Sequence, residues 1–442
     1  MALRSRRNRA PKWMVCRWTT CRWSTTREHH TSIHVEMHLD PDRREIAAHL
    51  VILACALFTF ACRSDNPVTP PTTSRALTVI GAGAVNERYT AEIWVLGNVA
   101  YTTTWGNRSA PGDAIKIWDV SGNVPTLVDS VIVPNASTLG DIQASDDGKL
   151  LVVATEFSPG SIMIYSLTDP LKPQLISRYT TALTDPGVHT AEVQRVNGRL
   201  YAFLCVDPAS GNPARLVIVD ITDPASPTQV FTAQMGSPFV HDVVARDGIL
   251  ITALWNQGVT VWDIGGAGAG SVANPMPLGS VVTVGGKAHN VWWFHNGVTG
   301  EKRYIFVGEE GPGSIGASSN GDVHVVDVSN FTAPREVAFF HLDGAGSHNF
   351  SVDENRGILY AAYYNGGVRA IDITGDLSSC DAANKSSDGR CDLAKMGREL
   401  AHGLGDVGPV YVWGVQLVGP SLYASDMLNG IWKLAPASLP PD

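Results

Sequence analysis

Apolar and polar residues alternate in short runs along the chain, and small groups of turn residues separate the runs. The segment His241–Ile264, "HDVVARDGILITALWNQGVTVWDI", shows the pattern. "DG" and "NQG" interrupt it where a tight turn would reverse the chain. The segment therefore predicts three antiparallel strands in a meander. A similar segment at Arg215–Val230, "RLVIVDITDPASPTQV", continues further. Here a Pro-containing connection follows the third strand and leads into a fourth.

The same unit occurs seven times. First strands are expected where its copies begin, at Ala91, Gly140, Ala191, His241, His289, His348 and Trp413. The second residues of these copies follow one another at spacings of 49, 51, 50, 48, 59 and 65 residues. Third strands are expected to begin at Ile115, Ile162, Leu216, Val259, Val323, Val368 and Gly430.

A period near 50 residues with four strands in each unit is typical of a β-propeller. We therefore expect an all-β fold over residues 75–440, a seven-bladed propeller of four-stranded antiparallel blades. A spare strand, "RALTVIGAG" from Arg75, precedes the first unit, and the chain ends soon after the third strand of the seventh. This N-terminal strand is expected to complete the last blade and leave no free edge. The two long spacings predict insertions near residues 308–322 and 375–409.

The third strands carry a resemblance to a known family. "LVIVD" stands verbatim at Leu216–Asp220, and the body of the chain from about Arg75 to Leu434 resembles the LVIVD-repeat β-propellers. The resemblance implies a propeller in a bacterial secreted or surface protein, and it implies no particular activity. Blade two has Ser166 and blade seven has Lys433 where the repeat has its Asp, which favours a structural and replaceable role for that Asp.

Composition and charge narrow the class of protein. Charged residues make up 17% of the 442 residues and hydrophobic ones 44%, as in a globular chain rich in turns. Residues 1–62 hold 10 Lys/Arg and 5 Asp/Glu, so the remainder has 23 basic and 37 acidic residues and a net charge of −14. An acidic body of this kind argues against nucleic acid as a partner, because nucleic-acid binding needs basic patches.

The front of the chain is predicted to direct export to a bacterial cell envelope. Arg43–Cys62, "RREIAAHLVILACALFTFAC", has two arginines and then an apolar run of about 16 residues, which suits a signal peptide over residues 37–62. Its end resembles a lipoprotein cleavage site with Cys62 as the lipidated residue, although Phe60 and Thr59 depart from that pattern. An ordinary secretory signal or an uncleaved signal anchor are the alternatives, and all three place the body outside the cytoplasm, in the periplasm or on the surface.

The segments on either side of this signal are assigned from composition. Residues 63–74 form a polar, Pro-rich flexible tether. Residues 1–36 are basic and fit neither signal nor domain, so they are predicted to be a mis-assigned or disordered extension, with Met37 as the true start. A long basic region of the signal peptide is the alternative.

The starts of the first strands carry the residues most suited to chemistry. In a propeller these strands line the channel, so their first residues should form a ring. Four of the eight histidines in the body and four carboxylates fall in this ring: His189, His241, His289, His348, Glu92, Asp141, Glu192 and Asp242. Imidazole and carboxylate groups are ligands for divalent transition metals such as zinc, copper, iron or manganese. The alternative is structural, with these residues joining neighbouring blades by hydrogen bonds.

Three further features are weaker. The ends of the second strands carry acidic and aromatic residues that would either stack on a ligand or pack between blades: Trp105, Glu156, Asp207, Trp255, Asn256, Glu309, Glu310, Tyr363, Tyr364, Asn365 and Asp426. Cys380 and Cys391 are expected to form a disulfide in an exported protein. Between them, Asp381, Asn384, Ser386 and Asp388 have the oxygen atoms that calcium binds, but the loop lacks the closing Glu of an EF-hand, so a calcium site is not favoured. Cys205 lies in an apolar strand and is expected to be a buried thiol.

Two functions are compatible with this sequence. The first is an envelope-anchored binding or scaffolding module for a protein, a glycan or a small ligand. The second is a metal-dependent enzyme, a hydrolase or oxidase, that uses the ring of histidines and carboxylates. The two differ in whether the ring holds a metal ion.

Overall fold

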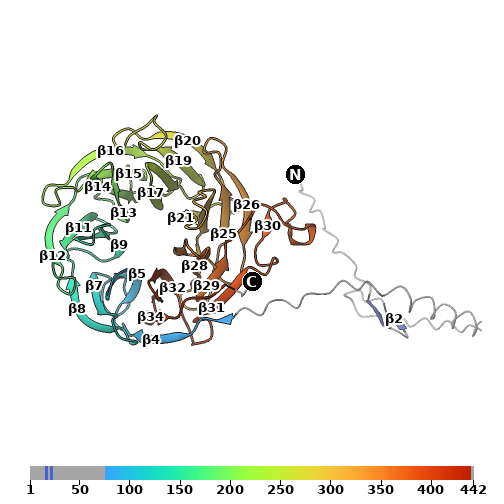
Figure 1. Cartoon of the computed structure of the whole chain (residues 1–442). Helices are drawn as coiled ribbons and strands as arrows, with labels where there is room; N and C mark the ends of the chain where they lie inside the picture. Colours follow the sequence, from blue (N-terminus) through green and yellow to red (C-terminus); the bar gives the residue numbers. More distant parts are fainter. Residues whose placement is uncertain (1–14, 18–19, 23–74, 440–442) are drawn as a thin grey trace, which may run out of the picture. The chain divides into compact units, whose positions relative to one another are not determined.

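Seven antiparallel sheets surround a central channel in the computed structural model, which describes residues 15–17, 20–22 and 75–439. Figure 1 shows the blades following one another around the ring in chain order. The predicted fold, a seven-bladed all-β propeller, is confirmed.

The first four blades have four strands each. Blade one contains β5 (Tyr89–Leu96), β6 (Val99–Trp105), β7 (Ala114–Asp119) and β8 (Thr126–Ile132). Blade two contains β9 (Leu139–Ala144), β10 (Leu150–Thr155), β11 (Ser161–Ser166) and β12 (Gln174–Tyr179). Blade three contains β13 (Val188–Val196), β14 (Arg199–Val206), β15 (Arg215–Asp220) and β16 (Thr228–Gln234). Blade four contains β17 (Asp242–Arg246), β18 (Ile249–Ala253), β19 (Val259–Asp263) and β20 (Met276–Val281).

The last three blades recruit strands from elsewhere in the chain. Blade five contains β21 (Ala288–Trp293), β22 (Tyr304–Glu309), β25 (Val323–Asp327), β26 (Arg335–Phe340) and the added β30 (Cys391–Asp392). Blade six contains β27 (Phe350–Asp353), β28 (Ile358–Ala362), β29 (Val368–Asp372), β31 (Glu399–Gly403) and the added β3 (Arg75–Ala76). Blade seven contains β32 (Val412–Val418), β33 (Ser421–Asp426), β34 (Gly430–Leu434) and β4 (Val79–Gly83).

The N-terminal strand closes the ring as the sequence predicts. β4 pairs antiparallel with β34, so Leu434 stands opposite Val79 and Ile431 opposite Gly83. The two residues of β3, just before β4, pair parallel with β31 of blade six. One short segment therefore joins the last two blades and covers the outer edge of blade seven.

Burial of apolar side chains holds neighbouring blades together. Each of seven hydrophobic clusters draws its residues mainly from two adjacent blades: Ile164 and Leu204 belong to the cluster of blades two and three, and Ile93 and Tyr423 to that of blades one and seven. Because every sheet has two faces to cover, a closed ring buries both faces of all seven blades in the described chain.

The Asp that ends the repeat is a turn-forming residue. Asp220 accepts a hydrogen bond from the backbone N–H of Thr222, at 2.9 Å. Ser166 of blade two accepts the equivalent bond through its hydroxyl. Lys433 of blade seven instead donates from Nζ to the carbonyls of Val120 and Gly122.

The two long spacings contain additional structure. Residues 308–322 include a short hairpin, β23 (Gly311–Pro312) and β24 (Ser319–Asn320). Residues 375–409 include the 3-10 helix η2 (Ala382–Asn384) and β30. They also include β31, the fourth strand of blade six, so this predicted insertion is in part a blade strand.

Several predictions on the front of the chain fall outside the described residues. Within residues 1–36 the structure describes an antiparallel hairpin, β1 (Val15–Arg17) and β2 (Thr20–Arg22). The signal peptide at 37–62, Cys62 and the tether at 63–74 lie outside the described residues. In the described part of the chain, no helix has the length and hydrophobicity that a membrane span requires.

Candidate metal-binding site in the channel

Four histidine side chains form a continuous row at one end of the channel. The ring centroids of His189 and His241 are 4.1 Å apart, those of His241 and His289 4.1 Å, and those of His289 and His348 4.2 Å. Trp413 of blade seven extends the row at 4.3 Å from His348. His241, His289 and His348 are buried, and His189 is the most exposed of the four, with 23% of its side chain accessible. The structure thus brings together all four histidines of the predicted ring.

Backbone pairing places carboxylates beside this row. The N–H of His241 donates to the carbonyl of Ala253 at the end of β18, so the start of the first strand lies beside the end of the second. Acidic residues directly after the second strands of blades two, three and five occupy this end of the channel: Glu156, Asp207 and Glu310.

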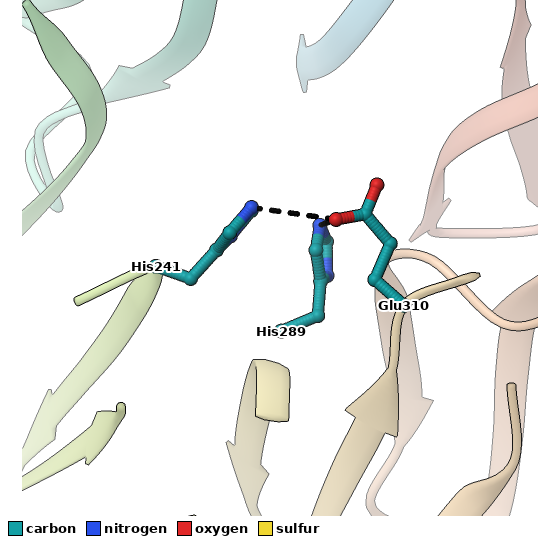
Figure 2. A group of neighbouring side chains, drawn as sticks. All are labelled: His241, His289 and Glu310. Carbon is teal, nitrogen blue, oxygen red and sulfur yellow. Dashed lines mark ion pairs between the residues drawn. The ribbon is translucent and has the colours of Figure 1, made fainter. Parts of the chain in front are cut away.

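One group of metal-ligand type consists of His241, His289 and Glu310 (Figure 2). Their ligand atoms all lie within 4.8 Å of one another. Oε2 of Glu310 is 3.6 Å from Nε2 of His241 and 4.0 Å from Nε2 of His289. The hydroxyl of Tyr364 donates to the other carboxylate oxygen of Glu310 at 2.6 Å and thereby orients it.

A second group consists of Glu156, His189 and Asp207, whose ligand atoms also lie within 4.8 Å of one another. Nδ1 of His189 is 3.5 Å from Oδ1 of Asp207 and 3.9 Å from Oε2 of Glu156. Glu156 belongs to blade two, and the other two residues belong to blade three.

Burial and neighbouring charges set the protonation of the histidines. Burial, followed by the charges of nearby histidines, holds the pKa values of His241 and His289 well below the usual range. Both imidazoles are therefore neutral near pH 7 and offer a lone pair to a metal ion. Burial also works against protonation of His189, but the carboxylates of Glu156 and Asp207 outweigh it and raise the pKa of His189 to about 10.

His348 is oriented by the backbone of the next blade. Its Nδ1 donates to the carbonyl of Trp413 at 2.7 Å, which leaves Nε2 without a proton when the ring is neutral. Burial lowers the pKa of His348 to about 3.

The carboxylates of the predicted ring mainly join neighbouring strands. Oδ2 of Asp141 accepts from the N–H of Ala191 at 2.8 Å, and Oδ2 of Asp242 accepts from the N–H of Val291 at 3.2 Å. Each bond links one blade to the next, which is the structural alternative raised for these residues.

Glu92 and Glu192 complete this carboxylate layer. Glu92 accepts from the side-chain amide of Asn349, and Glu192 is hydrogen-bonded to Gln143. Burial raises the pKa of Glu92 to about 8 and that of Glu192 well above its usual range. The structure thus places three of the four histidines, His189, His241 and His289, beside carboxylates other than those of the predicted ring.

A cavity of about 440 Å³ occupies the channel beside the histidine row. Its lining includes the four histidines, Glu156 and the carboxylate layer, together with Trp94, Trp292 and Arg246. A ligand in this cavity would contact both the metal-ligand groups and aromatic side chains.

Comparison with known families agrees with this architecture. Two segments, residues 211–234 and 317–341, match the LVIVD repeat. The chain is an LVIVD-repeat β-propeller. The two matched segments contain the third and fourth strands of blades three and five, β15–β16 and β25–β26. No curated protein matches the sequence.

The LVIVD-repeat propeller holds several bulky residues in left-handed backbone conformations around the histidine row. Phe157, Trp255 and Tyr364, each shortly after a second strand, have φ of 62°, 54° and 42°. Lys287, two residues before His289, has φ of 51°. Side chains of this size rarely adopt such conformations, and strained backbone of this kind is concentrated at functional sites.

Sequence reasoning placed Glu156, Asp207 and Glu310 in a separate group and missed their role beside the histidines. The sequence does contain a signal for this arrangement. In an antiparallel hairpin, the last residue of the second strand lies beside the first residue of the first strand. Applied to each blade, that rule places the two groups of residues at the same end of the channel.

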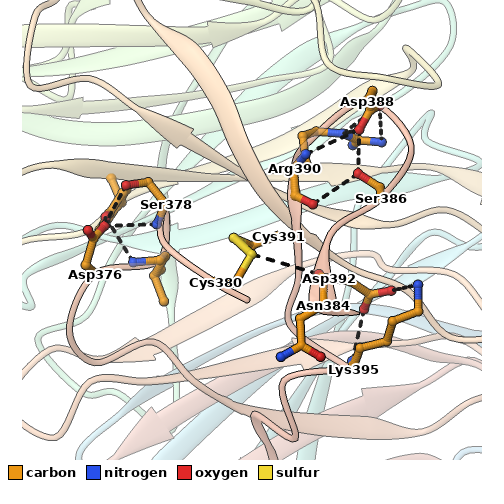
Figure 3. The surroundings of a disulfide bond; sticks show 12 residues. Asp376, Ser378, Cys380, Asn384, Ser386, Asp388, Arg390, Cys391, Asp392 and Lys395 are labelled. Carbon is orange, nitrogen blue, oxygen red and sulfur yellow. Dashed lines mark hydrogen bonds and ion pairs between the residues drawn. A yellow bond between two sulfur atoms is a disulfide. The ribbon is translucent and has the colours of Figure 1, made fainter. Parts of the chain in front are cut away.

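The loop between Cys380 and Cys391 is closed by a disulfide (Figure 3). Within it, the carboxylate of Asp388 accepts from Nε of Arg390 at 3.0 Å and from the hydroxyl of Ser386. The positive charge that offsets Asp388, one of the residues considered as calcium ligands, is thus provided by Arg390. Cys205 is a buried free thiol.

Proposed function

We propose that this propeller is a metal-dependent enzyme of the bacterial envelope that acts on a small molecule held in the channel. One observation carries the proposal: the imidazoles of His241 and His289, which line the channel cavity, converge with the carboxylate of Glu310. Two histidines and one carboxylate are a ligand set of catalytic zinc and non-haem iron sites, because they leave coordination positions free for water or substrate.

Each residue of the site has a distinct role in the proposal. His241, His289 and Glu310 hold the ion, and Tyr364 fixes the orientation of Glu310. The ion supplies Lewis acidity and lowers the pKa of bound water.

The location follows from the front of the chain. We propose export through the signal at 37–62 and anchoring by lipid on Cys62, with an uncleaved anchor as the alternative. The disulfide of the propeller supports an oxidising compartment.

A binding or scaffolding role is the second candidate, supported by the outer surface. On and beside β8, blade one exposes a group of apolar side chains with 41–58% of their surface accessible: Val124, Leu127, Val128 and Ile132. Exposed apolar patches of this kind mark contacts with other proteins. This role predicts a partner in the envelope, a protein or a glycan, and no turnover in the channel.

The metal content of the purified full-length chain tests the first proposal. We expect at least one divalent transition-metal ion per chain by elemental mass spectrometry, and a His289→Ala variant that keeps its circular dichroism spectrum should bind one ion fewer than the parent. His341→Ala is the matched control, because His341 lies on the same blade but is exposed and bonded to Asp322 and Asp343. A metal-free parent, after incubation with Zn²⁺, Fe²⁺ or Mn²⁺ in turn, would refute the proposal.

A further inference from the structure

We propose that Glu156, His189 and Asp207 bind a second divalent metal ion beside the first, so that the channel holds a dinuclear metal centre. This inference rests on the proposed function for the first ion. The second ion extends that function, because a two-metal site can clamp and polarise a ligand from two sides.

The geometry of the second group is that of a ligand set. Three donors from different parts of blades two and three meet with their ligand atoms within 4.8 Å of one another. Nδ1 of His189 faces both carboxylates, at 3.5 Å from Asp207 and 3.9 Å from Glu156. These distances are longer than direct hydrogen bonds, and an ion with ligand distances near 2.1 Å fits between such atoms after small side-chain movements.

The two carboxylates of this group have no Lys or Arg partner among the described residues. Throughout the described residues, Glu156 and Asp207 form ion pairs with His189 alone and with no Lys or Arg. Glu156 is buried and Asp207 is nearly so, with 16% of its side chain accessible. Two carboxylates held together with so little solvent favour a cation beside them, and a divalent ion can take the place of the proton on His189.

Glycine residues leave space for these carboxylates. A Cβ atom at Gly140 would lie 2.6 Å from Oε1 of Glu156 and 2.3 Å from the carbonyl of His189. Gly140 does not have a positive φ, so its backbone conformation does not require glycine. The absence of a side chain at this position is explained by the close approach of Glu156 and the backbone of His189.

The two groups are close enough to form one centre. The rings of His189 and His241, one from each group, are 4.1 Å apart. The two groups are therefore neighbours in the channel, as the two ligand sets of two-metal enzyme sites are. The second group has one nitrogen and two carboxylate donors, a harder set than the first, so Mn²⁺ or Fe²⁺ suits it better than Cu²⁺.

The number of bound ions tests this inference separately from the proposed function. The full-length chain and its variants are equilibrated with Mn²⁺, desalted and analysed by elemental mass spectrometry. We expect about two ions per chain in the parent and about one in both Asp207→Asn and His289→Ala. Electron paramagnetic resonance should show coupled Mn²⁺ ions in the parent and isolated Mn²⁺ in each variant.

The controls keep the outcomes distinct. Asp185→Asn changes an exposed carboxylate near blade three and should keep both ions, and Glu156→Gln replaces Asp207→Asn if the latter fails to fold. One ion in the parent that Asp207→Asn leaves unchanged overturns the dinuclear centre and leaves the proposed function standing. A parent without any ion overturns both.

Discussion

Blade seven has Gly414 at the position where the other blades carry a carboxylate or an amide, and a neighbour uses the space. A Cβ atom at Gly414 would lie 2.2 Å from Oε1 of Glu92. Glu92 of blade one reaches across blade seven to accept from the amide of Asn349 on blade six. At the scale of single residues, a missing side chain thus allows a bond between blades that are not adjacent.

The substitution Gly414→Ala should therefore destabilise the propeller by about 1–3 kcal/mol, because the added methyl group displaces the buried Glu92. Chemical unfolding measures the change. Gly122→Ala is the control, since no atom lies within 4 Å of a Cβ at Gly122, and its effect should stay within about 0.5 kcal/mol. Equal stability of the two variants would show that Glu92 is not constrained there.

His324 gives a prediction on pH. Burial opposes its charge, but Glu309 and Glu336 outweigh burial and raise its pKa to about 9, and Nδ1 lies 2.8 Å from Glu336. A pKa raised above the unfolded value of about 6.5 stabilises the fold fully below pH 6.5, and the contribution is lost as pH rises through 9.

The variant His324→Gln should test this dependence. At pH 6 it should unfold more easily than the parent by about 3–5 kcal/mol, the cost of breaking a buried pair. The difference in unfolding free energy should shrink steadily between pH 6.5 and 9.5. A difference that does not change over this range would mean that His324 is neutral in the folded protein.

At the scale of elements, the loop closed by Cys380 and Cys391 adds a strand to blade five. β30 pairs parallel with β26, and Arg390 just before it binds Glu336 of the same blade. The disulfide restricts the unfolded chain over this short loop, so replacing both cysteines by serine should cost about 2–4 kcal/mol. Thermal unfolding with and without reductant measures this: reductant should destabilise the parent and leave the double variant unchanged. Equal destabilisation of both would assign the effect to something other than the disulfide.

The elements themselves could be predicted from the sequence because the repeat fixes them. Alternating apolar residues and turn residues at a period near 50 locate the strands, and the spare strand before unit one locates the closure. β30 and β31 lie in the long segment after the third strand of blade six, and they could not be predicted because neither follows the spacing of the repeat. Their positions depend on which sheet edge is free, which is a property of the assembled ring.

The site could be predicted in part, for a related reason. Three of the histidines share one position in the repeat and His189 lies two residues before it, so their convergence follows from the sequence. Glu310 and Asp207 each directly follow a second strand, but the direction of their carboxylates depends on local backbone, including the left-handed Trp255 and Tyr364 around the row. Which oxygen faces which nitrogen is decided by such turns and not by the period.

At the scale of the whole molecule, the metal-ligand groups take their residues from blades two to five. Glu156 comes from blade two, His189 and Asp207 from blade three, His241 from blade four, and His289 and Glu310 from blade five. Ions bound there would connect four consecutive blades through the channel, in addition to the apolar contacts between their faces. Binding of metal to the folded ring should therefore appear as stability of the entire propeller.

Thermal unfolding in excess metal and in chelator tests this coupling. An ion that binds the folded chain at 100 times its dissociation constant adds about 2.7 kcal/mol of stability. Mn²⁺ or Zn²⁺ should raise the unfolding temperature of the parent, whereas Ca²⁺ should not, because imidazole ligands select transition metals. Asp207→Asn/His289→Ala, which removes one ligand from each group, should lose the shift. Equal stabilisation of that variant and the parent by the metal would show that the ion binds elsewhere on the chain. The histidine row would then serve packing between blades.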